Sequence, residues 1–385
     1  MTRHITLAQE ILPHDGRFGA GPSKIRSEQI SALVESNPTI LGTSHRQAPV
    51  RDLVASIKEG LAEFFSLPEG YEIIFGNGGA SAFWDIACAC LIRETAAFGV
   101  FGEFGGKFAT EAANAPFLPE PVIFDSAYGT TRLPELTQDA DVYAWPHNET
   151  STGAATTIRR VAGSAAAGAL TLIDGTSAAG GLPIDISQTD VYYFSPQKAF
   201  GADGGLWFAI VSPAAIARSE EIEENPAVTG RWIPTFLSFK TALRNSRKNQ
   251  TYNTPAIATL VMMNEQIEWL NRNGGLEWST RRCEKSAKTL YDWAEASDFA
   301  QPFVADPRDR SNVVVTLDID EELNAADIVA GLRENGIVDT FAYRKLNRNQ
   351  LRIGVFPSVE PEDVRALTDC IDETVRQLRA SDEER

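Results

Sequence analysis

Seven short apolar runs recur between residues 71 and 211, and their alternation with other segments constrains the fold more than any other feature. The runs lie at 71–75, 98–101, 121–124, 141–145, 170–173, 191–194 and 206–211, and most are separated by helical or loop segments. Strands that alternate with helices predict an α/β fold with right-handed crossovers and a mostly parallel sheet, here of seven strands. Because ligands bind beyond the carboxyl ends of the strands in such sheets, functional residues are expected there.

The remaining segments predict further helices and a second, smaller α/β unit. Apolar spacing is helical from about 27 to 66, and again from 255 to about 296 with an interruption at Gly274-Gly275. The segments that follow predict strand 312–318, helix 325–335, strand 350–355 and helix 360–378. A chain of 385 residues is too long for one simple core. We therefore expect a large domain over 17–258 and a small domain over 259–385 together with 1–16.

The composition limits the partners of the chain. A net charge of −17 argues against nucleic acid and against anionic membranes. No apolar stretch reaches the roughly 18 residues that span a bilayer. The first residues lack the apolar core of a secretory signal, so we expect a cytoplasmic protein. The cysteines are expected to be reduced structural residues, and the four scattered histidines predict no metal site; the cysteines are Cys88, Cys90, Cys283 and Cys370.

A lysine and an aspartate follow two of the predicted strands. Lys198 closes Ser195-Pro196-Gln197-Lys198 after an aromatic run, and Asp174 ends the run 170–173. This pair meets the needs of a pyridoxal phosphate enzyme. The amine forms a Schiff base with the cofactor aldehyde, and the carboxylate keeps the pyridine nitrogen protonated.

Other charged residues compete for these two roles. Asp185 and Asp190 are alternatives to Asp174, which we prefer because it directly follows a buried strand. Lys107 and Lys248 are alternatives to Lys198. A single lysine is usually a solvated charge, so only the combination with other motifs favours a cofactor site.

Three loops that follow other strands carry polar or aromatic groups suited to a cofactor. Gly76-Asn77-Gly78-Gly79-Ala80-Ser81 precedes a helical run, and glycine N–H groups at a helix N-terminus suit a phosphate, although a tight turn without ligand explains them equally well. Phe104 can stack on a planar ring, or it is an ordinary core aromatic. The cluster from His147 to Gly153 can hydrogen-bond a ring substituent or phosphate, or it caps a helix.

Arginine and amide side chains supply further candidate anion ligands. Arg352 lies inside an apolar strand, where its guanidinium needs an anion such as an amino acid α-carboxylate, unless it faces water at a sheet edge. His45 and Arg46 in a loop can receive a second anionic group. Asn253 and Thr254 can donate to a phosphate, cap the following helix, or do both.

Taken in order, these motifs resemble the class V pyridoxal phosphate aminotransferases of fold type I. Within that class the chain looks most like the phosphoserine aminotransferases of mycobacteria and their relatives. The likeness runs from about residue 18 to 357. The matching motifs are Phe18-Gly19-Ala20-Gly21-Pro22, Thr43-Ser44-His45-Arg46, Gly78-Gly79-Ala80-Ser81, Asn148-Glu149-Thr150, Asp174-Gly175-Thr176-Ser177, Ser195-Pro196-Gln197-Lys198, Asn253-Thr254-Pro255 and Leu351-Arg352.

The resemblance implies a role for each matching residue in binding pyridoxal 5'-phosphate. Lys198 would be the Schiff-base lysine and proton shuttle, and Asp174 would pair with the pyridinium nitrogen. Phe104 would stack on the ring, and Thr150 would contact the region of its phenolic oxygen. The phosphate would be held by Ala80, Ser81 and Gln197 and, from the partner subunit of a homodimer, by Asn253 and Thr254.

The resemblance also implies the reaction and its substrates. L-Glutamate would donate its amino group to 3-phosphohydroxypyruvate, which gives O-phospho-L-serine and 2-oxoglutarate in L-serine biosynthesis, and a related substrate in pyridoxine synthesis is left open. His45, Arg46 and Arg352 would bind the substrate anions. Many members carry arginine at the position of Ser81, so this chain departs from the pattern near the substrate phosphate.

Three alternatives remain at this stage. An alanine–glyoxylate aminotransferase shares the class V motifs. A cysteine desulfurase needs a reactive cysteine on a mobile loop, whereas Cys283 and Cys370 lie in helical stretches. A non-catalytic binding protein would be expected to lose Lys198 or Asp174, and both are present.

Overall fold

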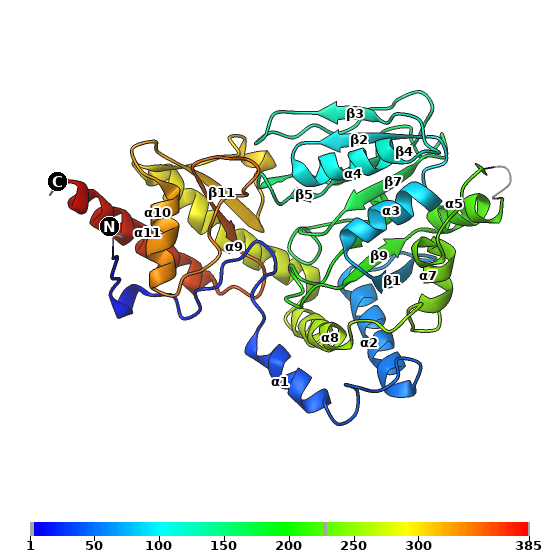
Figure 1. Ribbon diagram of the computed structural model, residues 1–385, viewed down its shortest axis with the longest axis horizontal. Helices are drawn as coiled ribbons and strands as arrows, with labels where there is room; N and C mark the ends of the chain where they lie inside the picture. Colours follow the sequence, from blue (N-terminus) through cyan, green and yellow to red (C-terminus); the bar gives the residue numbers. More distant parts are fainter. Residues whose placement is uncertain (1–3, 226–228, 384–385) are drawn as a thin grey trace.

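The computed structural model describes residues 4–225 and 229–383 and contains two main sheets of unequal size. The seven-stranded sheet with its helices occupies one end of the molecule (Figure 1). A three-stranded sheet with α10 (Ala325–Glu334) and α11 (Pro361–Glu383) occupies the other end. No helix in the described part of the chain is long and apolar enough to cross a membrane.

The larger sheet confirms the predicted mostly parallel arrangement. Its strand order is β1-β9-β8-β7-β4-β2-β3, and β9 is antiparallel to both of its neighbours while the other pairs are parallel. Each of the seven predicted runs overlaps one strand. The strands are β1 (Glu72–Asn77), β2 (Thr95–Val100), β3 (Val122–Asp125), β4 (Ala140–Pro146), β7 (Leu170–Asp174), β8 (Val191–Phe194) and β9 (Leu206–Val211).

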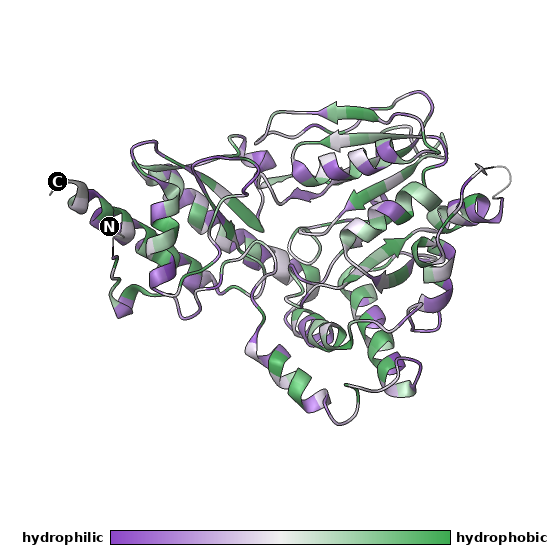
Figure 2. Ribbon diagram, in the orientation of Figure 1, coloured by the Kyte–Doolittle hydropathy of each residue, from purple (hydrophilic) through white to green (hydrophobic). Residues whose placement is uncertain are grey.

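Helices cover both faces of this sheet, which explains why its central strands are buried along their whole length and mostly hydrophobic (Figure 2). On β8, Tyr192 and Tyr193 point to opposite faces and belong to two different core clusters. One face packs against α3 (Ala80–Cys90), α4 (Glu103–Asn114), α5 (Pro213–Glu224) and α7 (Phe239–Ser246). The other face packs against α2 (Ala48–Phe64) and α8 (Ile257–Arg272).

The helical apolar spacing over 27–66 corresponds to two helices, and the loop predicted around His45 and Arg46 lies between them. The two helices are α1 (Ser27–Ser36) and α2. Gly42 adopts a positive φ of 73°, and Pro49 lies in the first turn of α2. Proline is tolerated at a helix start but not inside a helix, so the break falls before it.

The smaller sheet lies between α9 (Gly275–Ala296), α10 and α11 and confirms the elements predicted after residue 300. It is antiparallel in the order β10-β11-β12, with β10 (Ala300–Pro302), β11 (Val314–Ile319) and β12 (Gln350–Gly354). Only β10 was not predicted. Ile5 and Leu7 pack in the same core, which places the N-terminal segment beside this sheet. The division of the chain at 258 remains a prediction, and α8 packs on the large sheet.

The remaining described elements are short. Strands β5 and β6 form a short antiparallel hairpin that directly follows β4. The elements are β5 (Asn148–Glu149), β6 (Ala154–Ala155), η1 (Gln9–Ile11), η2 (Ile186–Gln188), η3 (Thr235–Leu237) and η4 (Pro307–Asp309).

Candidate active site

A cavity of about 280 Å³ lies beyond the carboxyl ends of β7 and β8, between the N-termini of α3 and α4. It brings together seven of the residues predicted from the sequence, although they are far apart along the chain: Ala80, Ser81, Phe104, Thr150, Asp174, Gln197 and Lys198. Gly79, Trp84, Lys107, Asn148, Thr176 and Ser177 complete the lining.

Lys198 is buried in the loop that follows β8, and its amine points toward the N-terminal loop that contains Ala20. Its Nζ donates a hydrogen bond to the Ala20 carbonyl at 2.6 Å. Burial and the nearby Arg352 lower the pKa of Lys198 to about 8, against an opposing effect of Asp174. A larger fraction of this amine is therefore uncharged near neutral pH than for an ordinary lysine, as a nucleophile and base requires. Gly21 leaves room for it, because a Cβ there would overlap the Lys198 side chain.

Asp174 is a buried carboxylate without a cationic partner. Its Oδ1 accepts from the Thr176 N–H at 2.8 Å, and among the described residues it forms no ion pair. Burial raises the pKa of Asp174, while hydrogen bonds from neighbours that include Tyr193 and Trp84 oppose the shift. Tyr193 is its register partner on β8, and the Trp84 Nε1 donates to the Tyr193 hydroxyl at 2.9 Å. A positively charged ring nitrogen would stabilise such a carboxylate.

Phe104 forms one wall of the cavity at the start of α4, and a buried carboxylate fixes its backbone. Glu149 accepts from the N–H groups of Phe104 and Gly105, both at 3.0 Å. The same carboxylate accepts from the Ser151 hydroxyl at 2.7 Å. The first turn of α4 is therefore capped by Glu149 and is not free to bind an anion.

The first turn of α3 is free of such a cap. Gly79 is its N-cap residue, and no side chain of the described residues accepts from the first N–H groups, which line the cavity at Ala80 and Ser81. A helix start of this kind binds phosphate.

Three buried polar atoms of the lining lack a hydrogen-bond partner: Asn148 Oδ1, Thr176 Oγ1 and Gln197 Oε1. Buried polar atoms are normally paired, so a polar ligand is expected to complete this site. The unpaired Asp174, the free helix start and the aromatic wall fit a ring with a charged nitrogen and a phosphate. The residues present therefore fit pyridoxal phosphate.

Arg352 lies beside the cavity without lining it. Its Nη1 donates to the Thr150 carbonyl at 3.3 Å, and its guanidinium lies 5.2 Å from the Tyr343 ring centroid. The Arg352 Nε is buried and unpaired, and within the described chain no carboxylate pairs with the guanidinium. An arginine in this state is suited to an incoming carboxylate.

Four predicted residues lie off this cavity in the single chain. His45 and Thr254 contact each other, with the His45 Nδ1 3.3 Å from the Thr254 Oγ1. Burial and the neighbouring Arg46 lower the pKa of His45. The Asn77 amide donates to the Thr254 carbonyl at 3.2 Å, so the group that also contains Asn253 packs beside the end of β1. Their roles in binding cofactor and substrate remain predictions.

Sequence reasoning missed several residues that line the cavity. Asn148 and Ser177 belong to motifs already identified, but no role was predicted for them. Trp84 was part of an apolar helical run, and its position three residues after Ser81 is the signal that places both on one face of α3. Lys107 was weighed only as a competitor of Lys198, although it follows Phe104 by three residues in the same way.

Comparison with known proteins is consistent with this geometry. The sequence profile of the family "Aminotransferase class-V" matches residues 129–340. A phosphoserine aminotransferase of Rhodococcus opacus (strain B4) is 53% identical over 378 residues, which cover 98% of this chain and 100% of that protein. A relative from Mycobacterium leprae (strain TN), for which the same activity is proposed, is 53% identical and covers 98% of this chain and 99% of its own length.

Solved structures share the fold. A phosphoserine aminotransferase of Cytophaga hutchinsonii superimposes with a TM-score of 0.83 at 22% identity, covering 93% of this chain and 99% of that one. These findings place the chain in a class of pyridoxal phosphate enzymes that transfer amino groups. The chain belongs to the phosphoserine aminotransferase family of the class V aminotransferases. The predicted family, fold class and cofactor are thereby confirmed.

Proposed function

We propose that this chain transfers the amino group of L-glutamate to 3-phosphohydroxypyruvate and forms O-phospho-L-serine and 2-oxoglutarate, a step toward L-serine. The observation that carries the proposal is the buried Lys198 amine in one cavity with the unpaired Asp174 carboxylate. The name of the Rhodococcus relative, at 53% identity over nearly the full chain, supports the choice of substrates.

Each of the lining residues has a role in this proposal. Pyridoxal phosphate, when bound, supplies an electron sink for the pair of electrons released at the substrate Cα. Lys198 would hold the cofactor through its aldehyde and, as a free amine, would carry the proton from the substrate Cα to the former aldehyde carbon. Asp174 would keep the ring nitrogen protonated, Phe104 would stack on the ring, and Thr150 would contact the region of its phenolic oxygen, since all three line the cavity.

The cofactor phosphate and the α-carboxylate of the substrate require further ligands. The free N-terminus of α3 binds the cofactor phosphate through Ala80 and Ser81, with Gln197 as a side-chain ligand. Arg352 receives the α-carboxylate of either substrate, because its guanidinium lies next to the cavity without a carboxylate partner.

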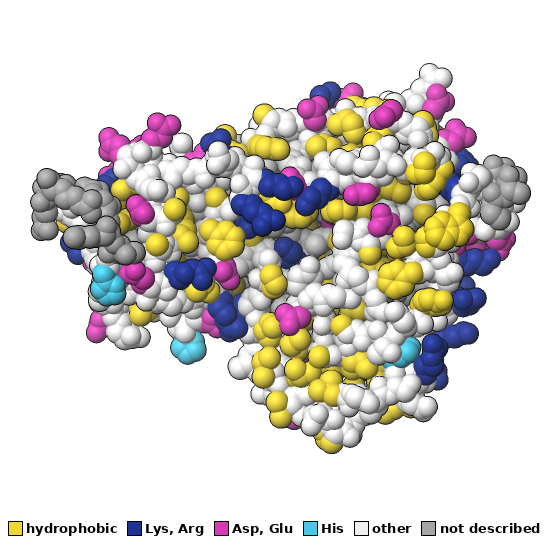
Figure 3. Space-filling model, viewed as in Figure 1, with side chains coloured by type: hydrophobic (Ala, Val, Ile, Leu, Met, Phe, Trp, Pro, Cys, Tyr) yellow, Lys and Arg dark blue, Asp and Glu magenta, His cyan; other side chains and the backbone are white. Residues whose placement is uncertain are grey.

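The remaining predicted residues act in this proposal across the interface of a homodimer. Asn253 and Thr254 contribute to the cofactor phosphate site of the partner subunit, and His45 and Arg46 bind substrate anions. Exposed apolar residues support an interface: hydrophobic side chains gather over α1 at the lower edge of the face in Figure 3, where Val34 is 69% exposed. Large exposed apolar patches mark interaction sites. We also propose that the enzyme acts in the cytoplasm.

A complementation experiment tests the shared site. Lys198→Ala and Asn253→Ala variants, each of low activity, are unfolded together, refolded and assayed. If Asn253 serves the partner's cofactor, each mixed dimer contains one site without either substitution. About a quarter of the parent activity should then return after random mixing, and about a half in purified mixed dimers. Unchanged low activity would contradict a shared site, and a monomer in sedimentation would contradict the dimer.

The reaction itself is tested by following 2-oxoglutarate formation from glutamate and 3-phosphohydroxypyruvate, with and without added cofactor. We expect turnover by the parent and none above background by Lys198→Ala. Glyoxylate with alanine tests the alanine–glyoxylate alternative. A desulfurase is disfavoured because burial raises the pKa of the Cys283 thiol to about 12, which keeps it protonated.

A further inference from the structure

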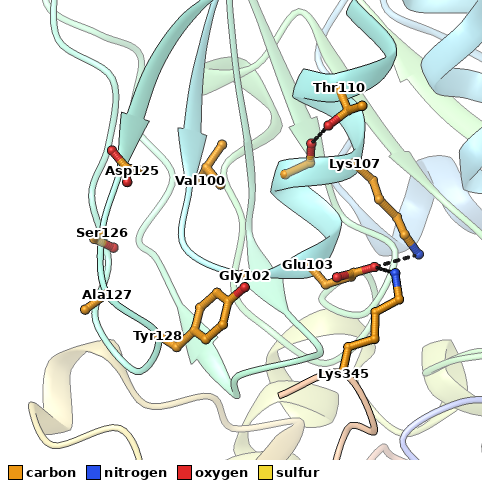
Figure 4. A pocket seen from close by; sticks show the side chains of 11 residues that line it. Val100, Gly102, Glu103, Lys107, Thr110, Asp125, Ser126, Ala127, Tyr128 and Lys345 are labelled. Carbon is orange, nitrogen blue, oxygen red and sulfur yellow. Dashed lines mark hydrogen bonds and ion pairs between the residues drawn. The ribbon is translucent and has the colours of Figure 1, made fainter. Parts of the chain in front are cut away.

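Lys107 is the one residue that the catalytic cavity shares with a larger hollow outside it. This outer hollow has a volume of about 670 Å³ and lies between α4, β3 and the segment that carries Lys345. Figure 4 shows the ammonium groups of Lys107 and Lys345 side by side at one carboxylate oxygen of Glu103. Lys107 therefore lines both the open hollow and the cavity of the reacting centre.

Within one chain, the inner cavity has few positive charges with which to bind a second anion, since His45 and Arg46 would reach the substrate only across the interface of the proposed dimer. Among its lining residues only Lys198 and Lys107 are cationic, and Lys198 is committed to the chemistry. Ser81, at the start of α3, contributes no charge. The Lys107 Nζ lies 5.3 Å from the Phe104 ring centroid, so it is placed beside the aromatic wall and not deep in the protein.

Glu103 cannot neutralise both lysines. The Lys107 Nζ lies 3.2 Å from the Glu103 Oε1, and the Lys345 Nζ contacts the same oxygen. Burial raises the pKa of Glu103, but the hydrogen bonds from Lys345 and Lys107 outweigh it and keep the carboxylate ionised. Two positive charges around one negative charge leave a net positive charge. Because partly exposed ion pairs are weak, Lys107 can exchange Glu103 for another anion at little cost, while Lys345 keeps Glu103 paired.

We infer that the Lys107 ammonium binds the distal anionic group of the substrate, the phosphate of 3-phosphohydroxypyruvate or the γ-carboxylate of glutamate. This inference rests on the proposed function and adds the specificity-determining residue that Ser81 does not provide. A flexible four-carbon stem with a compact charge suits two anions of different size and distance. The α-carboxylate remains with Arg352 at the other end of the substrate.

Three variants of the holoenzyme test this assignment. Lys107→Gln should raise the KM for 3-phosphohydroxypyruvate by about 10–100-fold with kcat within about threefold, the loss expected for one hydrogen bond to a charged group. Glu103→Gln should lower that KM by about two- to fivefold, because Lys107 loses its competing partner. Lys288→Gln is the matched control, since Lys288 also forms an exposed ion pair four residues away on its helix, with Asp292 at 2.7 Å.

Donors with and without a distal anion separate substrate binding from other effects. In the half-reaction followed by cofactor absorbance, Lys107→Gln should slow L-glutamate at low concentration by about tenfold and leave L-alanine unchanged. An equal loss with both donors would overturn the inference. A lower affinity of Lys107→Gln for the cofactor, with an unchanged KM for the substrate, would assign Lys107 to the cofactor phosphate. That result would also overturn the inference.

Failure of the proposed function is distinguishable from failure of this inference. A parent enzyme that does not aminate 3-phosphohydroxypyruvate contradicts the proposed function, and the comparison of glutamate with alanine still tests Lys107. If the parent enzyme aminates 3-phosphohydroxypyruvate and Lys107→Gln has the same KM as the parent, only the inference about Lys107 is contradicted.

Discussion

Replacing Glu149 by glutamine should loosen the cavity wall that carries Phe104. The Glu149 carboxylate is fully buried and accepts four hydrogen bonds, two from the N–H groups of Phe104 and Gly105 and two from the N–H and hydroxyl of Ser151. A carboxylate accepts on both oxygens, whereas a glutamine amide accepts on one side and donates on the other. One pair of donors would therefore face an NH₂ group.

The expected magnitude follows from that lost pair. Each hydrogen bond to a charged group is worth about 1.5–3 kcal/mol, and removing a buried charge offsets part of the loss. We expect the free energy of unfolding to fall by about 2–4 kcal/mol. Where the amide faces α4, Phe104 loses its fixed position, and affinity for the cofactor should fall about tenfold, the equivalent of about 1.4 kcal/mol.

Denaturant unfolding of the cofactor-free protein and titration with pyridoxal phosphate measure the two effects separately. Glu111→Gln, an exposed substitution on α4, is the control. Lost stability with unchanged cofactor affinity would refute a role of Glu149 in positioning Phe104. If Glu149→Gln keeps both its stability and its affinity for the cofactor, the four hydrogen bonds of Glu149 do not have the importance assigned to them.

Three further predictions concern Lys198 and Asp174. Because burial lowers the Lys198 pKa to about 8 from 10.5, the folded cofactor-free protein loses this proton before the unfolded chain does. The free energy of unfolding should then rise by about 3 kcal/mol between these pH values, and Lys198→Met should abolish the rise in denaturant titrations. Gly21→Ala, at a φ of 132° and against Lys198, should abolish turnover while far-UV circular dichroism stays native. Tyr193→Phe removes the hydroxyl between Trp84 and Asp174, and steady-state kinetics should show about a tenfold lower kcat with KM within twofold.

Most of the large sheet was predictable because its strands are buried on both faces. Such strands are continuous apolar runs, and the helices between them have their own period. β10 was missed because it is only three residues long, Ala300–Pro302, and one of them is exposed. The ends of α1 and α2 were not predicted, because apolar spacing continues on both sides of the loop and the residue at which each helix ends depends on packing.

The candidate site was predictable where its residues follow strands and not where they depend on packing. Lys198 and Asp174 end neighbouring parallel strands, so the sheet brings them together. The spacing of Lys107 from Phe104 indicates only a shared face of α4, and its ion-pair environment arises where α4 meets the segment of Lys345. His45 and Arg46 contact Thr254 and Gln250 beside the carboxyl end of β1, a position that no local pattern in the chain predicts.

The site of attachment of the cofactor tests the central claim most directly. The holoenzyme is reduced with borohydride, digested, and searched by mass spectrometry for peptides that carry the added mass of the reduced cofactor. The account predicts that the modification lies on Lys198 and that Asp174→Asn keeps this attachment while turnover falls at least about 100-fold. Attachment at Lys107 or Lys248, or unchanged turnover by Asp174→Asn, would contradict it.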